Sequence, residues 1–263
     1  MFRELRARIR SGHATVAWPG ASPPALPERF RGRPEIDAGA CPDDCTACAE
    51  ACPTGAVEFG AEGPRLDLGR CVFCASCLEA CPQSAIRYTR DHRLAARRRE
   101  DLVIGPGAEP ALATVLDAEL RRLFGRSLKL RQVSAGGCNG CESEVNVLST
   151  AVWDVGRFGV QIVASPRHAD GLLVTGPVTA AMEVALRKTY EAVPAPKIVI
   201  AAGACAISGG PFLFEPEQLG GADAVVPVDL YIPGCPPHPL TLLDGLLRLL
   251  GRLEAEGRVG GRR

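Results

Sequence analysis

The cysteines are the side chains of this sequence best suited to bind metal, and their spacing is regular. The chain has 263 residues and twelve cysteines, of which eight lie between residues 35 and 90. Four of these eight, Cys71, Cys74, Cys77 and Cys81, follow the C-x2-C-x2-C-x3-C-P spacing that holds 4Fe-4S clusters. Structural zinc sites usually use two separated cysteine pairs. The compact run with a terminal proline therefore predicts an iron–sulfur cluster rather than zinc.

The other four N-terminal cysteines form a second, slightly altered copy of this motif. Cys41 and Cys45 are separated by three residues instead of two, and Pro42 and Asp43 suit a turn that absorbs the extra residue. Both copies continue alike, with a Cys-Pro turn and then a predicted strand, as an internal duplication would. In such a pair the fourth cysteine of each motif binds the other cluster. The predicted ligand sets are Cys41, Cys45, Cys48 and Cys81 for one cluster and Cys71, Cys74, Cys77 and Cys52 for the other.

The last four cysteines are spread over three segments: Cys138-Asn139-Gly140-Cys141, Cys205 and Cys235. Each segment closely follows a predicted strand, and the carboxyl ends of parallel strands meet at one edge of a sheet. Glycines beside these cysteines allow the backbone to approach a bulky ligand. The pattern predicts that Cys138, Cys141, Cys205 and Cys235 hold a third 4Fe-4S cluster.

Alternating strands and helices must position these last four cysteines. The apolar pattern predicts strands at 128–133, 160–164, 171–174, 197–201 and 228–232, and helices at 109–124, 141–149, 178–193 and 239–254. Such alternation is typical of a parallel sheet covered on both faces. The predicted domains are an N-terminal docking segment (1–34), a domain with two 4Fe-4S clusters (35–90), a linker and helix (91–125) and an α/β domain that binds the last cluster (126–263).

Composition and charge exclude several classes of protein. The chain has 30 basic and 30 acidic residues and a formal net charge of zero, which removes the electrostatic basis for nucleic-acid binding. The first residues are not followed by the apolar stretch of a secretory signal, so a disulfide framework is not expected. No apolar run approaches the length of a membrane span. A G-x-G-x-x-G nucleotide fingerprint is absent from the sequence.

Three segments outside the cysteine motifs carry weaker signals. Residues 1–12 predict a short arginine-rich helix with three apolar residues on one face, which either docks on protein or touches anionic lipid. Residues 18–34 contain five prolines and are expected to run extended over another surface. The arginine run at 97–99 is expected to form a solvated face.

Residues around the last four cysteines resemble a known family. The segments Gly137-Cys138-Asn139-Gly140-Cys141 with Glu144, Gly203-Ala204-Cys205 and Pro233-Gly234-Cys235-Pro236-Pro237 resemble the small subunit of membrane-bound, energy-converting NiFe hydrogenases of the formate hydrogenlyase type. The B-type subunit of NADH:quinone oxidoreductase is similar, but it has adjacent cysteines where this chain separates Cys138 and Cys141. The N-terminal part, with Phe30-Arg31-Gly32-Arg33-Pro34-Glu35 and both cluster motifs, resembles the polyferredoxin-like subunit of the same complexes. The sequence therefore resembles two such subunits fused into one chain.

This resemblance implies both a fold and a role. The expected fold is an α+β ferredoxin-like domain with two clusters, followed by an α/β flavodoxin-like parallel-sheet domain. The chain would be the electron-transfer subunit of a hydrogenase-type oxidoreductase, without a complete active site of its own. Its three 4Fe-4S clusters would lead to or from a NiFe centre in a partner large subunit. The alternative is the equivalent subunit of a nickel-free complex that passes electrons to quinone or drives ion translocation.

Partners and location follow from the same resemblance. The implied partners are a hydrogenase-type large subunit, integral membrane subunits, and an electron donor or acceptor such as formate dehydrogenase or ferredoxin. The implied location is peripheral, on the cytoplasmic side of the cell membrane. A zinc-stapled scaffold that moves no electrons is the competing hypothesis from another class.

Glu144 and His238 are candidates for proton transfer beside the last cluster. Glu144 matches a carboxylate that follows the C-x2-C pair in the related small subunits, and its alternative role is to favour a helix N-terminus through the dipole. His238 follows Cys235 by three residues. It either tunes the cluster or carries a proton, or it is an exposed loop histidine.

Overall fold

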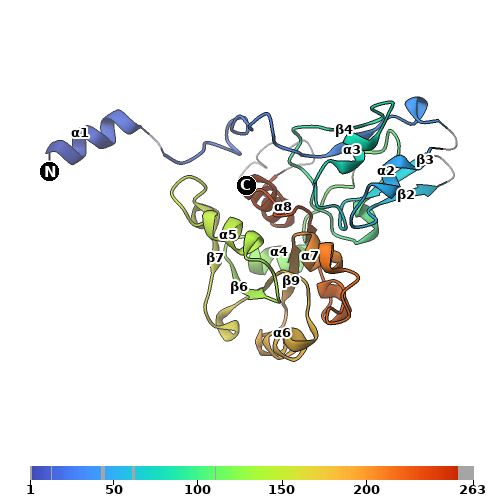
Figure 1. Cartoon of the computed structure of the whole chain (residues 1–263). Helices are drawn as coiled ribbons and strands as arrows, with labels where there is room; N and C mark the ends of the chain where they lie inside the picture. Colours follow the sequence, from blue (N-terminus) through green and yellow to red (C-terminus); the bar gives the residue numbers. More distant parts are fainter. Residues whose placement is uncertain (1, 13, 43–44, 61–62, 110, 254–263) are drawn as a thin grey trace.

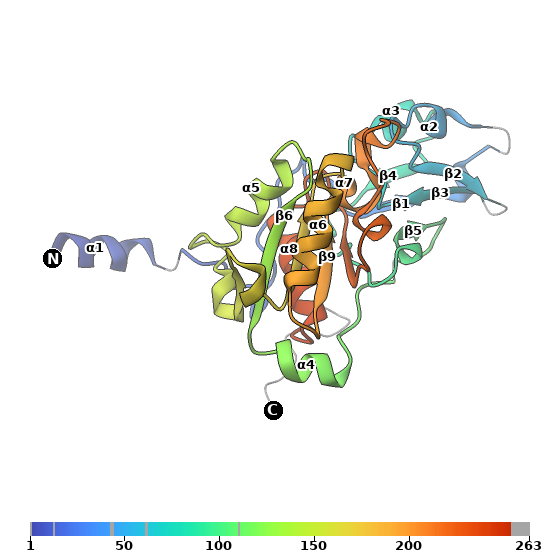
Figure 2. The ribbon, with the colours of Figure 1, turned by 90° about the horizontal axis from the view of Figure 1, so that it is seen from below.

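A computed structural model describes residues 2–253 except 13, 43–44, 61–62 and 110. Two portions pack side by side: a cysteine-rich portion and an α/β domain (Figures 1 and 2). A helix, α1 (Phe2–Ser11), stands apart from both portions in each view and has no buried residue. In the described part of the chain, no helix is long and apolar enough to cross a bilayer.

The α/β domain is built on one five-stranded parallel sheet. Its strands are β6 (Leu128–Ser134), β7 (Val160–Ile162), β8 (Gly171–Thr175), β9 (Ile198–Ala202) and β10 (Leu230–Ile232). The spatial order is β10-β9-β8-β6-β7, and all neighbours are parallel. Counted from the β7 edge, this is the 2-1-3-4-5 order of flavodoxin-like sheets. The central strand β8 and its neighbour β9 are buried on both faces, which explains their continuous apolar sequences.

Helices cover both faces of this sheet, as the alternating pattern predicts. They are α5 (Gly140–Val147), α6 (Ala180–Ala192), α7 (Ala204–Ser208) and α8 (Pro239–Leu249). Residues of α6 and α7 pack with one face, and residues of α5 and α8 pack with the other. Short 3₁₀ helices complete the connections at Ala38–Ala40, Glu100–Leu102, Val155–Phe158, Pro166–His168, Gly210–Phe212 and Ala222–Ala224.

The helix predicted at 109–124 is wrong in its first half. Among the described residues of this range, only α4 (Ala118–Phe124) is helical, and it begins where the Asp117 carboxylate accepts a hydrogen bond from the Leu120 amide. Upstream, the Ala113 amide donates to the Ala95 carbonyl and the Leu116 amide donates to the Leu249 carbonyl. These tertiary hydrogen bonds hold the backbone extended against the domain, so the local apolar spacing does not decide the structure here.

The described residues of the cysteine-rich portion include two small antiparallel sheets and two short α-helices. One sheet pairs β1 (Pro34–Ile36) with β4 (Ile86–Tyr88), and the other has the order β2 (Val57–Gly60), β3 (Gly63–Asp67) and β5 (Val103–Ile104). The helices are α2 (Ala47–Glu50) and α3 (Ser76–Ala80). Strand β2 follows the first Cys-Pro turn and β4 follows the second, which confirms the strand predicted after each motif.

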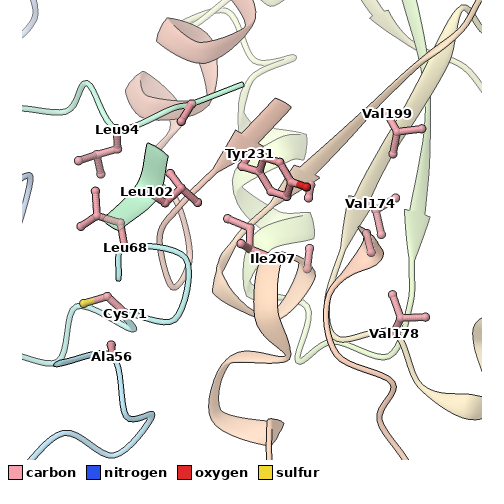
Figure 3. Close-up of a cluster of buried hydrophobic side chains, with 14 of the residues drawn as sticks. Ala56, Leu68, Cys71, Leu94, Leu102, Val174, Val178, Val199, Ile207 and Tyr231 are labelled. Carbon is pink, nitrogen blue, oxygen red and sulfur yellow. The ribbon is translucent and has the colours of Figure 1, made fainter. Parts of the chain in front are cut away.

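One hydrophobic cluster joins the two portions. Leu68 and Leu102 contribute from the cysteine-rich side, and Ile207 and Tyr231 contribute from the α/β side. Figure 3 shows Ile207 and Tyr231 between the side chains of the two portions. The backbones also meet, since Ala96 and Tyr231 form an antiparallel bridge. The portions therefore share a core rather than being joined by a free linker.

The arginine run at 97–99 is not the solvated face that the sequence suggested. Arg97 donates a 2.7 Å hydrogen bond to the carbonyl of Asp229. Arg99 forms a bidentate ion pair with Asp67, with distances of 2.8 and 2.6 Å. Only Arg98 fits the expectation, because its side chain is 66% exposed. Two of the three arginines therefore fasten the connection between the portions.

The proline-rich segment lies on the chain's own domains. Trp18 is 3% exposed, and Arg157 donates hydrogen bonds to the carbonyls of Val16 and Trp18. Further along, the Gly32 amide donates to Thr89 and the Arg33 amide donates to Asp91. The segment thus crosses from the α/β domain to the cysteine-rich portion, extended as its prolines require.

Candidate iron–sulfur sites

The four C-terminal cysteines lie at the carboxyl edge of the parallel sheet. Cys138 and Cys141 follow β6, Cys205 lies in α7 after β9, and Cys235 follows β10. Gly203, at a φ of +95°, turns the chain between β9 and α7, and a Cβ on it would lie 2.5 Å from Cys141 Sγ. Only glycine fits this position, because a side chain would be both strained and in contact with the sulfur.

The thiols at this edge are close enough to influence one another. Burial, together with neighbouring Cys205, Cys235 and Cys138, raises the pKa of Cys141 to about 12. Burial and the same kind of neighbours raise the pKa of Cys205 to about 12. If these thiols lost their protons, the resulting thiolates would repel one another in this partly buried site. A positively charged iron core would offset that repulsion by binding them as thiolates.

Glu142 and Glu144, both in α5, have different surroundings. Glu142 is 8% exposed and accepts hydrogen bonds from Ser134 Oγ at 2.6 Å and Thr175 Oγ1 at 2.8 Å. Burial alone raises the pKa of Glu142, but these two hydrogen bonds outweigh it and leave the pKa lowered. Glu144 instead lines a cavity with Cys235, and burial raises its pKa. Glu142 therefore links the ends of β6 and β8, whereas Glu144 is one of the residues that line the cavity beside Cys235.

Cys71, Cys74, Cys77 and Cys52 form a second group. Burial is the main cause that raises the pKa of Cys71 to about 12, and nearby Cys77 and Cys52 add to it. Burial also raises the pKa of Cys77, with further increases from Cys52 and Cys74. Tyr88 Oη lies 3.7 Å from Cys71 Sγ and 3.8 Å from Cys77 Sγ. The structure thus brings together the first three cysteines of the second motif and the fourth cysteine of the first motif, the set predicted for one cluster.

Cys41, Cys45, Cys48 and Cys81 line a single small cavity. Its remaining walls are mostly apolar and include Pro64, Pro82 and Ile86. Asp43 in the predicted turn lies outside the described residues. These four cysteines are the other predicted ligand set, in which Cys81 comes from the second motif and the other three come from the first.

The two ferredoxin motifs repeat one hydrogen bond. The Ala56 amide donates to Cys52 Sγ at 3.2 Å, and the Ala85 amide donates to Cys81 Sγ at 3.2 Å. Each acceptor is the fourth cysteine of its motif, and each donor precedes the strand that follows. This symmetry supports the internal duplication, and it shows backbone amides directed at sulfur, as in iron–sulfur sites.

An open cavity of about 320 Å³ lies between the two portions. Cys235, Glu144 and His238 line it from the α/β domain, and Phe73 and Arg31 line it from the other side. Cys74 of the second group is close enough to Cys235 to raise its pKa, after the larger effect of burial. The cavity therefore lies where the second cysteine group meets the C-terminal group.

His238 is not an exposed loop histidine. Its ring is half-buried between the rings of Phe30 and Trp153, with centroid distances of 5.3 and 5.7 Å. His238 Nδ1 accepts a hydrogen bond from the Leu240 amide and caps the N-terminus of α8. Burial lowers the pKa of His238, which favours its neutral form.

The sequence assigns no role to several residues of these sites, although Arg31 lies in the Phe30-Arg31-Gly32-Arg33-Pro34-Glu35 segment of the family resemblance. Arg31 donates to the carbonyls of Phe73 and Cys74, and Ser134 and Thr175 hold Glu142. Tyr88 has a weak signal, since it follows the Ala-Ile pair of the second repeat. None of the twelve cysteines forms a disulfide, so their sulfur atoms are available as ligands.

Comparison with known proteins identifies both portions. Residues 138–249 match the family described as NADH ubiquinone oxidoreductase, 20 Kd subunit, and residues 64–87 match the 4Fe-4S binding domain. The second match contains Cys71, Cys74, Cys77 and Cys81. It supports iron–sulfur binding in the cysteine-rich portion.

Three relatives are named as subunits of oxidoreductases. Formate hydrogenlyase subunit 7 of Escherichia coli K12 is 47% identical over 146 residues, 56% of this chain and 57% of the relative. Probable membrane-bound hydrogenase subunit mbhJ of Pyrococcus furiosus is 46% identical over 136 residues, 52% of this chain and 81% of the relative. The B-type subunit of NADH-quinone oxidoreductase from Heliobacterium modesticaldum is 40% identical over 127 residues, 48% of this chain and 73% of the relative. The chain thus spans little more than half the length of the formate hydrogenlyase subunit.

Proposed function

Because the chain belongs to the family of the NADH ubiquinone oxidoreductase 20 Kd subunit, we propose that it is the electron-transfer subunit of a membrane-bound hydrogenase complex. The observation that carries this proposal is the gathering of the twelve cysteines into three groups of four. A 4Fe-4S cluster needs four thiolates, and it supplies one-electron transfer when bound.

The residues fit three such clusters. Cys41, Cys45, Cys48 and Cys81 would hold the first; Cys71, Cys74, Cys77 and Cys52 the second; and Cys138, Cys141, Cys205 and Cys235 the third. Two observations support this assignment. Backbone amides donate hydrogen bonds to the sulfur atoms of Cys52 and Cys81, and Gly203 leaves room for the sulfur atom of Cys141. The N-terminal portion would then be a ferredoxin-like domain fused to the flavodoxin-like one.

The second cysteine group is the one that adjoins the C-terminal group, since Cys74 lies close enough to Cys235 to add to the rise of its pKa. Cys48 of the first group lies close enough to Cys77 of the second group for Cys77 to add to the rise of its pKa, which burial causes chiefly. This arrangement orders the sites from Cys41 through Cys71 to Cys138. Glu144 remains the candidate for moving a proton at the last site, because its carboxyl lines the cavity there with a raised pKa.

The proposed partners are those that the family resemblance implies. A large subunit with a NiFe centre, integral membrane subunits, and a donor or acceptor such as formate dehydrogenase or ferredoxin would complete the complex. The chain would sit peripherally, on the cytoplasmic side of the membrane. The separated Cys138 and Cys141 favour this hydrogenase branch. The relative from NADH-quinone oxidoreductase supports the alternative, a nickel-free complex that passes electrons to quinone or drives ion translocation.

Metal analysis of the anaerobically purified complex, together with a hydrogen-evolution assay, tests the proposal. We expect about twelve irons per chain without stoichiometric zinc, nickel in the large subunit, and hydrogen evolution with a strong reductant. Iron without nickel or hydrogen would favour the alternative. Stoichiometric zinc without visible iron–sulfur absorbance would refute electron transfer altogether.

A further inference from the structure

Arg31 reaches from the proline-rich segment onto the loop that carries Cys74. Its Nη1 donates two hydrogen bonds of 2.9 Å, one to the Phe73 carbonyl and one to the Cys74 carbonyl. Phe73 has a φ of +54°, which is uncommon for a residue with a side chain. The guanidinium therefore holds an unusual turn between Cys71 and Cys74.

The backbone at Arg31 is fixed on both sides. Next to it, the Gly32 amide donates to the Thr89 carbonyl at 2.8 Å, and a Cβ on Gly32 would collide with the Asp91 carbonyl. Before it, the Phe30 ring packs edge-on against His238 of the α/β domain. Consecutive residues thus contact both portions, and Arg31 has little freedom to place its charge elsewhere.

Arg31 also lines the cavity where the second and C-terminal cysteine groups meet. The other charged or titratable side chains that line this cavity, besides Cys235, are Arg29, Glu144 and His238. Among these four non-cysteine side chains, Arg31 is the one that bonds to the backbone of a cysteine ligand loop. The guanidinium of Arg31 thus places a cation with a planar set of donors beside this loop.

We propose that Arg31 is a positioning residue that raises the reduction potential of the cluster held by Cys71, Cys74, Cys77 and Cys52. Adding an electron makes a cluster more negative, and a fixed cation bonded to the ligand loop stabilises that state. The guanidinium also offsets the partial negative charge of the two loop carbonyl oxygens to which it donates. The inference rests on the proposed cluster assignment and adds a role that the cysteine motif does not contain.

Anaerobic redox titration of the intact complex, followed by electron paramagnetic resonance, tests this role. Arg31→Gln should lower the midpoint potential of the second cluster and leave the other two unchanged. Arg31→Lys should give a smaller shift in the same direction, because its ammonium keeps the charge but cannot bridge the two carbonyls in the same way. Arg122→Gln, on the exposed side of α4, changes net charge equally and should shift nothing.

An unchanged second-cluster potential in Arg31→Gln with all clusters present would overturn the inference. If Arg31→Gln fails to assemble the second cluster, Arg31→Lys decides: a lowered potential supports the inference, and a wild-type potential overturns it. A wild-type complex without a cluster at Cys71 would instead refute the proposed function, so the two failures are distinguishable.

Discussion

Replacing Ile207 by alanine tests whether the two portions of the chain unfold as one unit. Ile207 lies in α7 and is 2% exposed. Gly69 of the cysteine-rich portion is so close that a Cβ there would lie 2.7 Å from Ile207 Cγ2. The substitution removes three buried carbons, worth about 2.4 kcal/mol at ~0.8 kcal/mol each. Because Gly69 has no side chain to fill the void, the remaining cavity brings the expected loss to about 3–4 kcal/mol.

Anaerobic urea titration measures this loss through two signals. Visible absorbance reports on the iron–sulfur sites, and far-ultraviolet circular dichroism reports on the sheet and helices. We expect both midpoints to fall together in Ile207→Ala, since its side chain lies in the cluster that the portions share. Ile162→Ala is the matched control, because Ile162 at the end of β7 is 40% exposed. Its expected effect is below about 0.5 kcal/mol.

Two results would contradict this reasoning. Equal midpoints for Ile207→Ala and Ile162→Ala would mean that the shared cluster contributes little stability. A shift of the dichroism signal alone would mean that the cysteine-rich portion is stable without its contact to α7. In that case the hydrophobic cluster in Figure 3 would be a contact surface between independent units.

Three further predictions concern acid stability, the C-terminal site and membrane attachment. Asp91 accepts two hydrogen bonds from the Arg93 guanidinium. Burial raises the pKa of the Asp91 carboxyl, but these hydrogen bonds outweigh burial, so the pKa in the folded protein lies below 3.8. The stabilisation by this pair is therefore complete at pH values above 3.8, the unfolded pKa, and is lost as the pH falls through the lower pKa of the folded state. Asp91→Asn should therefore lower stability at pH 7 by about 1–2 kcal/mol and flatten its acid dependence, and an unaltered urea midpoint at pH 7 would argue against the pair. Cys205→Ala should abolish only the C-terminal cluster and hydrogen evolution, because the ferredoxin motifs share no ligand with that site; simultaneous loss of all three spectroscopic signals would contradict the assignment. In cell fractionation the chain should stay with the membrane at high salt and become soluble when the membrane subunits are deleted, whereas retention without them would show that α1 itself binds lipid strongly.

The parallel sheet could be predicted because its sequence periodicity and its buried structure agree. Strands β8 and β9 are apolar at nearly every position and buried on both faces. The start of α4 could not be predicted, since the hydrogen bonds of Ala113 and Leu116 go to residues distant in sequence. Local spacing carries no information about such partners.

The cysteine groups could be predicted because ligand spacing is a local constraint, except at Cys205 and Cys235, which depend on strand order. The side chains that surround these cysteines could not be predicted. Arg31 contacts a loop more than forty residues away, and Glu142 is held by the ends of two strands. The exposed-loop alternative for His238 and the solvated face expected at Arg97 and Arg99 were wrong for the same reason. Their contacts come from residues distant in sequence, which the pattern of a single segment does not include.

The shared core means that this single chain is organised like a permanent two-subunit assembly. Gly105 and Gly107 lie in the connection between the portions, and a Cβ on either would meet open space. Around that connection, the Ala96–Tyr231 bridge, the Arg97–Asp229 hydrogen bond and the buried cluster hold the two sides together. Obligate interfaces between separate chains resemble a domain core cut in half. A chain cut at 105–107 would therefore yield two polypeptides that remain bound, and the peptide link serves chiefly to fix their ratio at one to one.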